Sequence, residues 1–127
     1  MPVKLIFTWR CYLESLELAH LLVDTILEKK GSDITILDLR EQALFADYFL
    51  LCNGENERQL GALASSIVED AKKKAQVRPI GVEGEPQHGW MLVDFGDLIV
   101  HIFAPARRSY YRLEELWSQA YTVLEMQ

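Results

Sequence analysis

Three side chains that could make contacts at a surface, Trp90, Leu92 and Asp94, are spaced two residues apart. Side chains alternate along a β-strand, so these three would share one face, while Met91 and Val93 take the other. An ionised aspartate is rarely buried without a partner. If Asp94 meets solvent, Trp90 lies on or near the solvent side, where tryptophan is strongly enriched at binding hot spots. The alternative is that Trp90 packs under a loop and Asp94 only caps the next turn. The sequence leaves both open.

The patterns that mark common catalytic and metal sites are missing from the sequence. There is no Gly-x-Ser-x-Gly motif and no glycine-rich phosphate loop. The histidines and cysteines do not fall at ligand spacing. His101 lies on an apolar stretch, which is typical of a core or interface histidine. Asp94 and Asp97 flank a short turn, where aspartates are common because they hydrogen-bond the backbone. We therefore predict no catalytic residue, no metal ligand and no cofactor.

The charge of the chain favours a protein partner over a nucleic acid. The sequence has 19 acidic and 13 basic residues, a formal charge of −6. A net-negative domain repels phosphate backbones unless its basic residues cluster, so direct nucleic-acid recognition is not expected. An acidic protein suits a basic protein partner instead. No stretch approaches the ~18 apolar residues of a membrane span, and the two cysteines are too few for a disulfide framework. We expect a cytoplasmic, reducing location without a membrane.

The elements that would position these residues follow from hydrophobic periodicity. Helical spacing begins near Leu13 and ends at Lys29-Lys30-Gly31, where the glycine is expected to take a positive φ. Asn56 with Gln59 resembles a capping box that starts a second helix. Phe95-Gly96-Asp97 predicts a hairpin turn. Strands are predicted at Asp33 to Leu39, Ala46 to Asn53, Pro79 to Val82, Trp90 to Asp94 and Leu98 to Phe103, with a loop from Gly84 to Gly89 and a final helix from about Ser109 that includes Leu113, Leu116, Trp117, Ala120 and Leu124.

This order predicts a single α/β domain with a mixed sheet of about five strands flanked by helices. We assign residues 13–127 to the domain and residues 1–12 to an N-terminal extension. The extension is either a loose segment or an edge strand over Val3 to Thr8.

Short motifs spread from about Leu16 to Tyr121 together resemble the ribosomal silencing factor (Iojap) family. Each motif alone would be weak, but their order and spacing over about 100 residues make coincidence a poor explanation. The motifs are Glu28-Lys29-Lys30, Leu37-Asp38, Ala46-Asp47-Tyr48-Phe49, Gly54 with Arg58-Gln59, Gly81-Val82-Glu83-Gly84, Trp90 through Asp94 with Gly96-Asp97, Val100-His101-Ile102-Phe103, Arg108, and Tyr110-Tyr111-x-Leu113-Glu114-x-Leu116-Trp117.

The resemblance implies a domain of nucleotidyltransferase-like shape that is not an enzyme. It implies binding to the large ribosomal subunit through ribosomal protein L-fourteen, which blocks joining of the small subunit and represses translation when nutrients are short. It also implies homodimers in isolation. Residue by residue, the partner surface carries over to Trp90, Leu92, Asp94 and His101, and more weakly to Arg108, Tyr110 and Glu114.

The competing hypothesis is a nucleotidyltransferase-like enzyme. Such enzymes have a Gly-Ser pair after a strand and an Asp-x-Asp metal cluster. Here the corresponding strand ends in Cys52-Asn53-Gly54-Glu55, and no Asp-x-Asp occurs. Two features depart from the family pattern: residues 1–12 have no counterpart in it, and Arg112 stands where an acidic residue is commoner.

Overall fold

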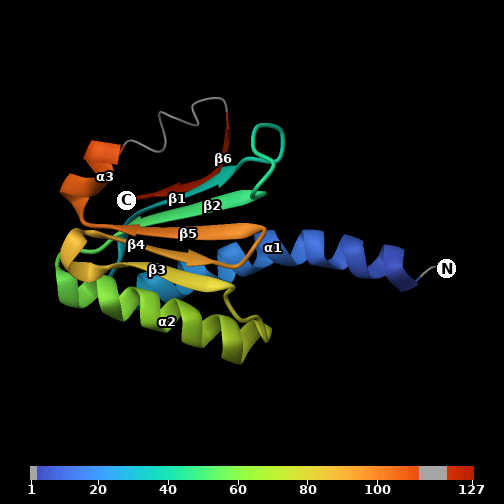
Figure 1. Ribbon diagram of the computed structural model, residues 1–127, viewed down its shortest axis with the longest axis horizontal. Helices are drawn as coiled ribbons and strands as arrows, with labels where there is room; N and C mark the ends of the chain where they lie inside the picture. Colours follow the sequence, from blue (N-terminus) through green and yellow to red (C-terminus); the bar gives the residue numbers. More distant parts are fainter. Residues whose placement is uncertain (1–2, 112–119) are drawn as a thin grey trace.

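The structure, a computed structural model, describes the backbone of residues 3–111 and 120–127 and the side chains of residues 15–109 and 120–127. One mixed sheet has the strand order β3-β4-β5-β2-β1-β6, in which β2 and β5 are parallel and the other neighbours antiparallel (Figure 1). The predicted α/β domain is confirmed, with one strand more than expected. The elements are α1 (Val3–Glu28), β1 (Ser32–Asp38), β2 (Tyr48–Asn53), α2 (Glu57–Ala75), β3 (Gly81–Glu85), the 3-10 helix η1 (Pro86–His88), β4 (Trp90–Asp94), β5 (Leu98–Phe103), α3 (Pro105–Tyr111) and β6 (Tyr121–Met126).

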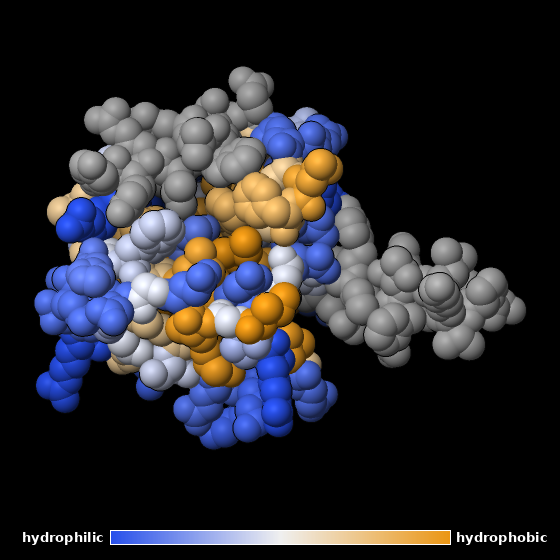
Figure 2. All heavy atoms as spheres, in the orientation of Figure 1, coloured by the Kyte–Doolittle hydropathy of each residue, from blue (hydrophilic) through white to orange (hydrophobic). Residues whose placement is uncertain are grey.

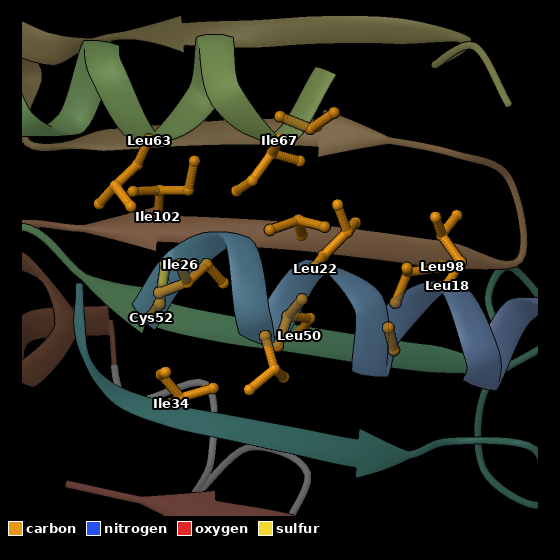
Figure 3. Packing of buried hydrophobic residues seen from close by; sticks show 14 of the residues in the cluster. Leu18, Leu22, Ile26, Ile34, Leu50, Cys52, Leu63, Ile67, Leu98 and Ile102 are labelled. Carbon is orange, nitrogen blue, oxygen red and sulfur yellow. The ribbon is translucent and has the colours of Figure 1, made fainter. Parts of the chain in front are cut away.

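Helices α1 and α2 cover the same face of the sheet and form the main hydrophobic core with it (Figures 1 and 3). Leu22 and Ile26 of α1 and Leu63 and Ile67 of α2 are completely buried. Their spacing of four residues puts each pair on one side of its helix. Burial of side chains of this size contributes roughly 1.5–3 kcal/mol each. The sheet contributes to this cluster Ile34, Ile36, Tyr48, Leu50, Cys52, Val93, Leu98, Val100 and Ile102.

The predicted cap starts helix α2 and also joins it to α1. The side chain of Asn56 accepts a hydrogen bond of 2.9 Å from the backbone N–H of Gln59. The Gln59 side chain accepts from the N–H of Glu55 at 2.6 Å, one residue earlier than a strict capping box requires. Its amide also donates to the carbonyls of Lys29 and Lys30 at 3.0 and 2.8 Å. One glutamine thus satisfies backbone groups at the start of one helix and the end of the other.

Helix α1 ends differently from our prediction. Lys30, not Gly31, takes the positive φ, at 66°. A glycine is still required at position 31, because an added Cβ would lie 2.4 Å from Cγ2 of Ile26 and 3.3 Å from Cδ2 of Leu63. The glycine therefore permits close packing of the chain against both helices, and the turn itself is made by the lysine.

The hairpin between β4 and β5 has the predicted turn. The N–H of Phe95 bonds the carbonyl of Leu98 at 2.9 Å, and Gly96 takes a φ of 91°. The strand that precedes this hairpin, β3, was predicted at Pro79 to Val82, but in the structure it covers Gly81–Glu85. The expected loop is consequently shortened to η1 and Gly89.

The structure differs from our predictions at both ends of the chain. Helix α1 begins at Val3, so an edge strand over residues 3–8 is wrong. Helix α3 begins at Pro105, where the missing N–H of proline is harmless in a first helical turn. Leu124 belongs to strand β6, which pairs antiparallel with β1. The i, i+4 spacing of Ala120 and Leu124 suggested a helix, but Tyr121-Thr122-Val123 has the aromatic and β-branched side chains that favour a strand. Leu113, Leu116 and Trp117 lie outside the described residues.

Candidate partner-binding surface

The face of the sheet opposite α1 and α2, here called the open face, carries a second and smaller cluster. It contains Phe49 and Leu51 from β2 and Phe103 from β5, with Trp90 packed against them. Val93 lies in the core under the helices. In the β4–β5 ladder, Trp90 pairs with Phe103, Leu92 with His101 and Asp94 with Ile99. Because directly paired residues share a face and Phe103 and Ile99 belong to this cluster, Leu92 and Asp94 project on the same side as Trp90, away from those helices. The predicted grouping of Trp90, Leu92 and Asp94 on one face is therefore confirmed. All three are partly exposed.

Trp90 is held in place by two aromatic neighbours and a hydrogen bond. Its ring stacks on Phe103, with centroids 5.7 Å apart and planes 11° apart. It also stacks on His101 at 5.9 Å and 20°. The indole Nε1–H donates to Nδ1 of His101 at 3.2 Å. Trp90 is thus neither buried under a loop nor free to rotate: one part of the ring is fixed on the sheet and another part meets solvent.

His101 is a buried, neutral residue at the centre of the open face. Its exposed fraction is 4 %, and its ring makes an edge contact with Phe49 at 4.6 Å. Because Nδ1 accepts the indole proton, the neutral ring carries its own proton on Nε2. Among the residues that the structure describes, none makes a hydrogen bond with that Nε2. Burial lowers the pKa of His101 from 6.5 to about 4, since the charged form would lose its hydration. Its small exposed area leaves little room for direct contact with a partner.

The aromatic contacts continue beyond His101 to the loop between β1 and β2. Phe45 of that loop lies 6.0 Å from Phe49, with an angle of 50° between the rings. We therefore define the aromatic row as Phe45, Phe49, His101, Trp90 and Phe103. Successive centroids along it are 4.6 to 6.0 Å apart. Phe45 and Phe49 were not among the predicted site residues. The signal was available, because Ala43-Leu44-Phe45 is an apolar run between two predicted strands.

Asp94 caps the hairpin turn, as the second interpretation of the sequence expected. Its Oδ1 accepts a hydrogen bond of 2.7 Å from the N–H of Gly96. The carboxylate nevertheless remains partly exposed. The two interpretations are compatible, because one oxygen can fix the turn while the carboxylate keeps its charge at the surface.

Arg108 holds α3 against the sheet through hydrogen bonds within the chain. Its guanidinium donates to the backbone carbonyl of Asp33, to Oδ1 of Asn53 at 3.0 Å and to Oγ1 of Thr35 at 3.1 Å. Asn53 and Thr35 are buried, with exposed fractions of 5 % and 6 %. Asn53 also donates to the carboxylate of Asp33 at 3.1 Å. Arg108 therefore satisfies buried polar groups at the ends of β1 and β2, which is a structural role that the sequence did not reveal.

Two predicted site residues are not placed on this surface. The side chain of Tyr110 and the whole of Glu114 lie outside the described residues.

Within the part of the chain that the structure describes, no three histidine, cysteine, aspartate or glutamate side chains are grouped as metal ligands would be. The one cysteine there, Cys52, is buried, and burial raises the pKa of its thiol to about 12. Among the same residues, no helix is long and apolar enough to span a membrane.

The end of β2 differs from a phosphate-binding loop in its packing. The N–H of Gly54, which directly follows the strand, donates to the carbonyl of Phe103 at 2.8 Å. A Cβ at this glycine would lie 3.0 and 3.2 Å from methyl groups of Leu60 and Leu63. Gly54 is thus explained by its close approach to α2. On the open face, the partly exposed Trp90 and Leu92 lie on the same strand as the partly exposed carboxylate of Asp94, which suits recognition of a protein.

Comparison with protein families gives one match over nearly the whole chain. Residues 12–127 match the family model described as "ribosomal silencing factor during starvation". A ribosomal silencing factor from Halalkalibacterium halodurans is 40% identical over 110 residues, which are 84% of this chain and 91% of that protein. A mouse protein named "mitochondrial assembly of ribosomal large subunit protein 1" is 30% identical over 100 residues, 77% of this chain and 44% of its own length.

A solved structure also matches the fold. The crystal structure of a protein from Chromobacterium violaceum superimposes with a TM-score of 0.77 at 36% sequence identity. The match covers 82% of this chain and 86% of the other. The mixed sheet with its helices is thus shared with a protein of clearly related sequence.

Proposed function

The chain belongs to the ribosomal silencing factor (Iojap) family, and from that premise we propose that it binds the large ribosomal subunit and prevents the small subunit from joining. The partner is a protein of the large subunit, ribosomal protein L-fourteen, and the protein acts in the cytoplasm. The subunits are kept apart by occlusion, because a domain seated on the joining surface occupies space that the small subunit needs. Fewer complete ribosomes then form, and translation falls.

The observation that carries this proposal is the way in which Trp90 is presented on the open face. A tryptophan that is fixed before binding loses little conformational entropy on binding and contributes a large apolar area. The stack on Phe103 at 5.7 Å and the hydrogen bond to His101 at 3.2 Å provide that order. Trp90 is therefore the apolar anchor of the surface, with Leu92 beside it on β4.

His101 acts in this proposal by positioning the anchor. With 4 % of its surface exposed, it contributes mainly through the bond that orients the indole. Asp94 provides the charged contact, since its carboxylate can form a charge-assisted hydrogen bond with an arginine or lysine of a basic partner. Tyr110 and Glu114 are secondary members of the proposed surface, whereas Arg108 supports it indirectly by holding α3 against the sheet.

The proposed activity needs no catalysis. Steric occlusion requires only that the domain binds the large subunit and is large enough to block the small one. A nucleotidyltransferase would instead need metal-binding carboxylates beside a phosphate loop. Incubation of the purified chain with labelled nucleoside triphosphates and a divalent metal ion separates the two hypotheses. We expect no transfer of label, and reproducible transfer would favour the enzyme.

Direct binding tests the proposal. Purified chain is sedimented with isolated large subunits, with isolated small subunits, and with large-subunit RNA stripped of protein. We expect co-sedimentation with the large subunit alone. Equal sedimentation with protein-free RNA would point to an RNA-binding module instead, and failure to bind large subunits would remove the proposed function.

A further inference from the structure

We propose that the partner surface extends from the open face onto the loop between β1 and β2, where Leu44 and Phe45 form a second apolar anchor for the same basic protein partner. This inference rests on the proposed function, because it names a further part of the surface that would contact the ribosomal protein. The loop is defined here as residues 39–47. Figure 2 shows hydrophobic atoms near the upper edge of the view, where Figure 1 shows this loop.

Leu44 and Phe45 are exposed on a loop that is otherwise well anchored. Leu44 is completely exposed, and Phe45 is 57 % exposed. The neighbours Leu39, Ala43 and Ala46 are buried, with exposed fractions of 0 %, 8 % and 4 %. The loop is closed by backbone hydrogen bonds, with Leu39 donating to Asp47 at 2.8 Å and Ala43 donating to Leu39 at 2.9 Å. Leu44 contributes nothing to folding from its exposed position, and Phe45 leaves more than half of its surface exposed although its ring contacts Phe49. Two adjacent large apolar side chains exposed on a fixed loop favour a role in contact with another molecule.

The loop is joined to Trp90 through a series of packed rings. The Phe45 ring lies 6.0 Å from Phe49, and Phe49 lies 4.6 Å from His101, which bonds Trp90. Phe45 therefore stands at one end of the aromatic row, and Trp90 stands next to Phe103 at the other end. Phe49 and His101, which lie between the two anchors, are buried, so the row joins the anchors through packing and is not itself the contact area. Interfaces commonly place a few apolar anchors within one patch surrounded by polar residues.

The charges around the loop identify the partner's chemistry. The loop and the hairpin turn meet directly, since Asp47 and Tyr48 donate to the carbonyl of Asp97 at 2.8 and 3.0 Å. Residues 38–47 and 94–97 include five acidic residues and one basic residue, a formal charge of −4 out of −6 for the chain. The one basic side chain, Arg40, is paired with Asp38 at 2.6 Å. The surroundings of the anchor are thus acidic, which fits a basic protein and repels an acidic one.

Asp47 and Asp97 add a local reason for a cationic partner. Burial, and then the nearby charge of Asp97, raise the pKa of Asp47. Two carboxylates that repel one another are relieved when a lysine or arginine approaches both. In a two-fold symmetric dimer formed through this loop, a second copy of the chain would offer apolar area but would bring the same negative end against it. We therefore assign the loop to the basic ribosomal partner and not to a dimer contact.

The test compares Leu44→Ala with Leu27→Ala in binding to isolated large subunits. Leu27 is a leucine of α1 that is 43 % exposed on the helix side of the sheet, so it controls for the loss of exposed apolar area. Because Leu44 is completely exposed, its truncation removes no packing and should leave the fold intact. We expect Leu44→Ala to weaken binding at least fivefold and Leu44→Ala with Phe45→Ala at least twentyfold. Leu27→Ala should change binding less than twofold.

The outcomes distinguish this inference from the proposed function. If the wild type does not bind large subunits, the proposed function fails and this inference fails with it. If the wild type binds and Trp90→Ala weakens binding while Leu44→Ala does not, the function stands and the second anchor is wrong. A change in self-association measured by sedimentation velocity, with unchanged subunit binding, would assign the loop to a contact between copies and would also overturn the inference.

Discussion

Nε1 of Trp90 on β4 donates a hydrogen bond of 3.2 Å to Nδ1 of His101 on β5. Leu92 and His101 are the directly paired residues of these strands, and Trp90 pairs with Phe103. The indole therefore reaches diagonally across the ladder and lies over both aromatic rings of β5. A buried residue thus determines the orientation of a partly exposed one, and changes at position 101 should alter binding through Trp90.

Removal of the acceptor at position 101 should weaken binding to the large subunit. In His101→Leu the indole loses its hydrogen bond, which contributes about 1 kcal/mol, so we expect binding to weaken by about fivefold. In His101→Asn an amide oxygen can take the place of Nδ1, and binding should remain within about twofold of the wild type. Titration of labelled protein with large subunits measures both. Equal losses in the two variants would contradict the positioning role.

His101 should also make the fold less stable in mild acid. Its pKa in the folded state is about 4, below the ordinary value of 6.5 for histidine, so the unfolded chain binds more protons between these two values. The contribution of His101 to the free energy of unfolding is therefore fully present above about pH 6.5 and is lost as the pH falls toward 4. Between pH 7 and pH 5.5, we expect His101 to lower the free energy of unfolding by about 1 kcal/mol.

Urea unfolding of the wild type and of His101→Asn at both pH values isolates this contribution, since other titrating groups are common to the two proteins. The difference between the proteins should be pH-dependent with the stated sign. A difference that is the same at pH 7 and pH 5.5 would mean that His101 is not held neutral by burial.

Charge at position 94 should matter more than the hydrogen bond of the turn. In Asp94→Asn the side-chain oxygen can still accept from the N–H of Gly96, so the hairpin is kept and one charge is lost. In Asp94→Lys a positive charge would face a basic partner, which is expected to be worse by roughly 1–2 kcal/mol or more. Binding to large subunits at two salt concentrations measures both variants. Equal effects of Asn and Lys would rule out the charged contact.

Arg108 should be needed mainly for stability. Arg108→Ala leaves Asn53, Thr35 and the Asp33 carbonyl without a donor, and we expect a loss of about 2 kcal/mol in the free energy of unfolding. Arg107→Ala, at the exposed neighbouring position, is the matched control and should change it by about 0.5 kcal/mol or less. If Arg108→Ala unfolds like the control but binds large subunits poorly, Arg108 is a contact residue instead.

The elements that the sequence predicted well are those whose signals are local. Helix α2 shows both an apolar stripe, with Leu60, Leu63 and Ile67 buried, and a side-chain cap at Asn56. The β4–β5 hairpin was evident from its glycine-containing spacer. Strand alternation also placed Trp90, Leu92 and Asp94 on one face, because that inference needs no knowledge of neighbouring strands.

The features that the sequence could not predict depend on contacts between distant residues. Arg108 is 73 residues from Thr35 and 55 from Asn53, so no periodicity links them. The aromatic row joins a loop to three strands through the order of the sheet, which single-sequence patterns do not provide. Strand β6 was missed because its pairing with β1 decides its structure, and its short apolar spacing fits a helix as well.

The most direct test of the proposed mechanism is a subunit-joining assay with Trp90→Ala. Isolated small and large subunits are mixed with wild-type or variant protein, and complete ribosomes are measured by sucrose-gradient sedimentation, with circular dichroism as the control for folding. We expect the wild type to prevent joining and Trp90→Ala, weakened by at least ~2 kcal/mol in binding, to prevent it only at about thirtyfold higher concentration. A folded Trp90→Ala protein that blocks joining as well as the wild type would contradict the proposed surface. A wild type that leaves joining unchanged would contradict the mechanism itself.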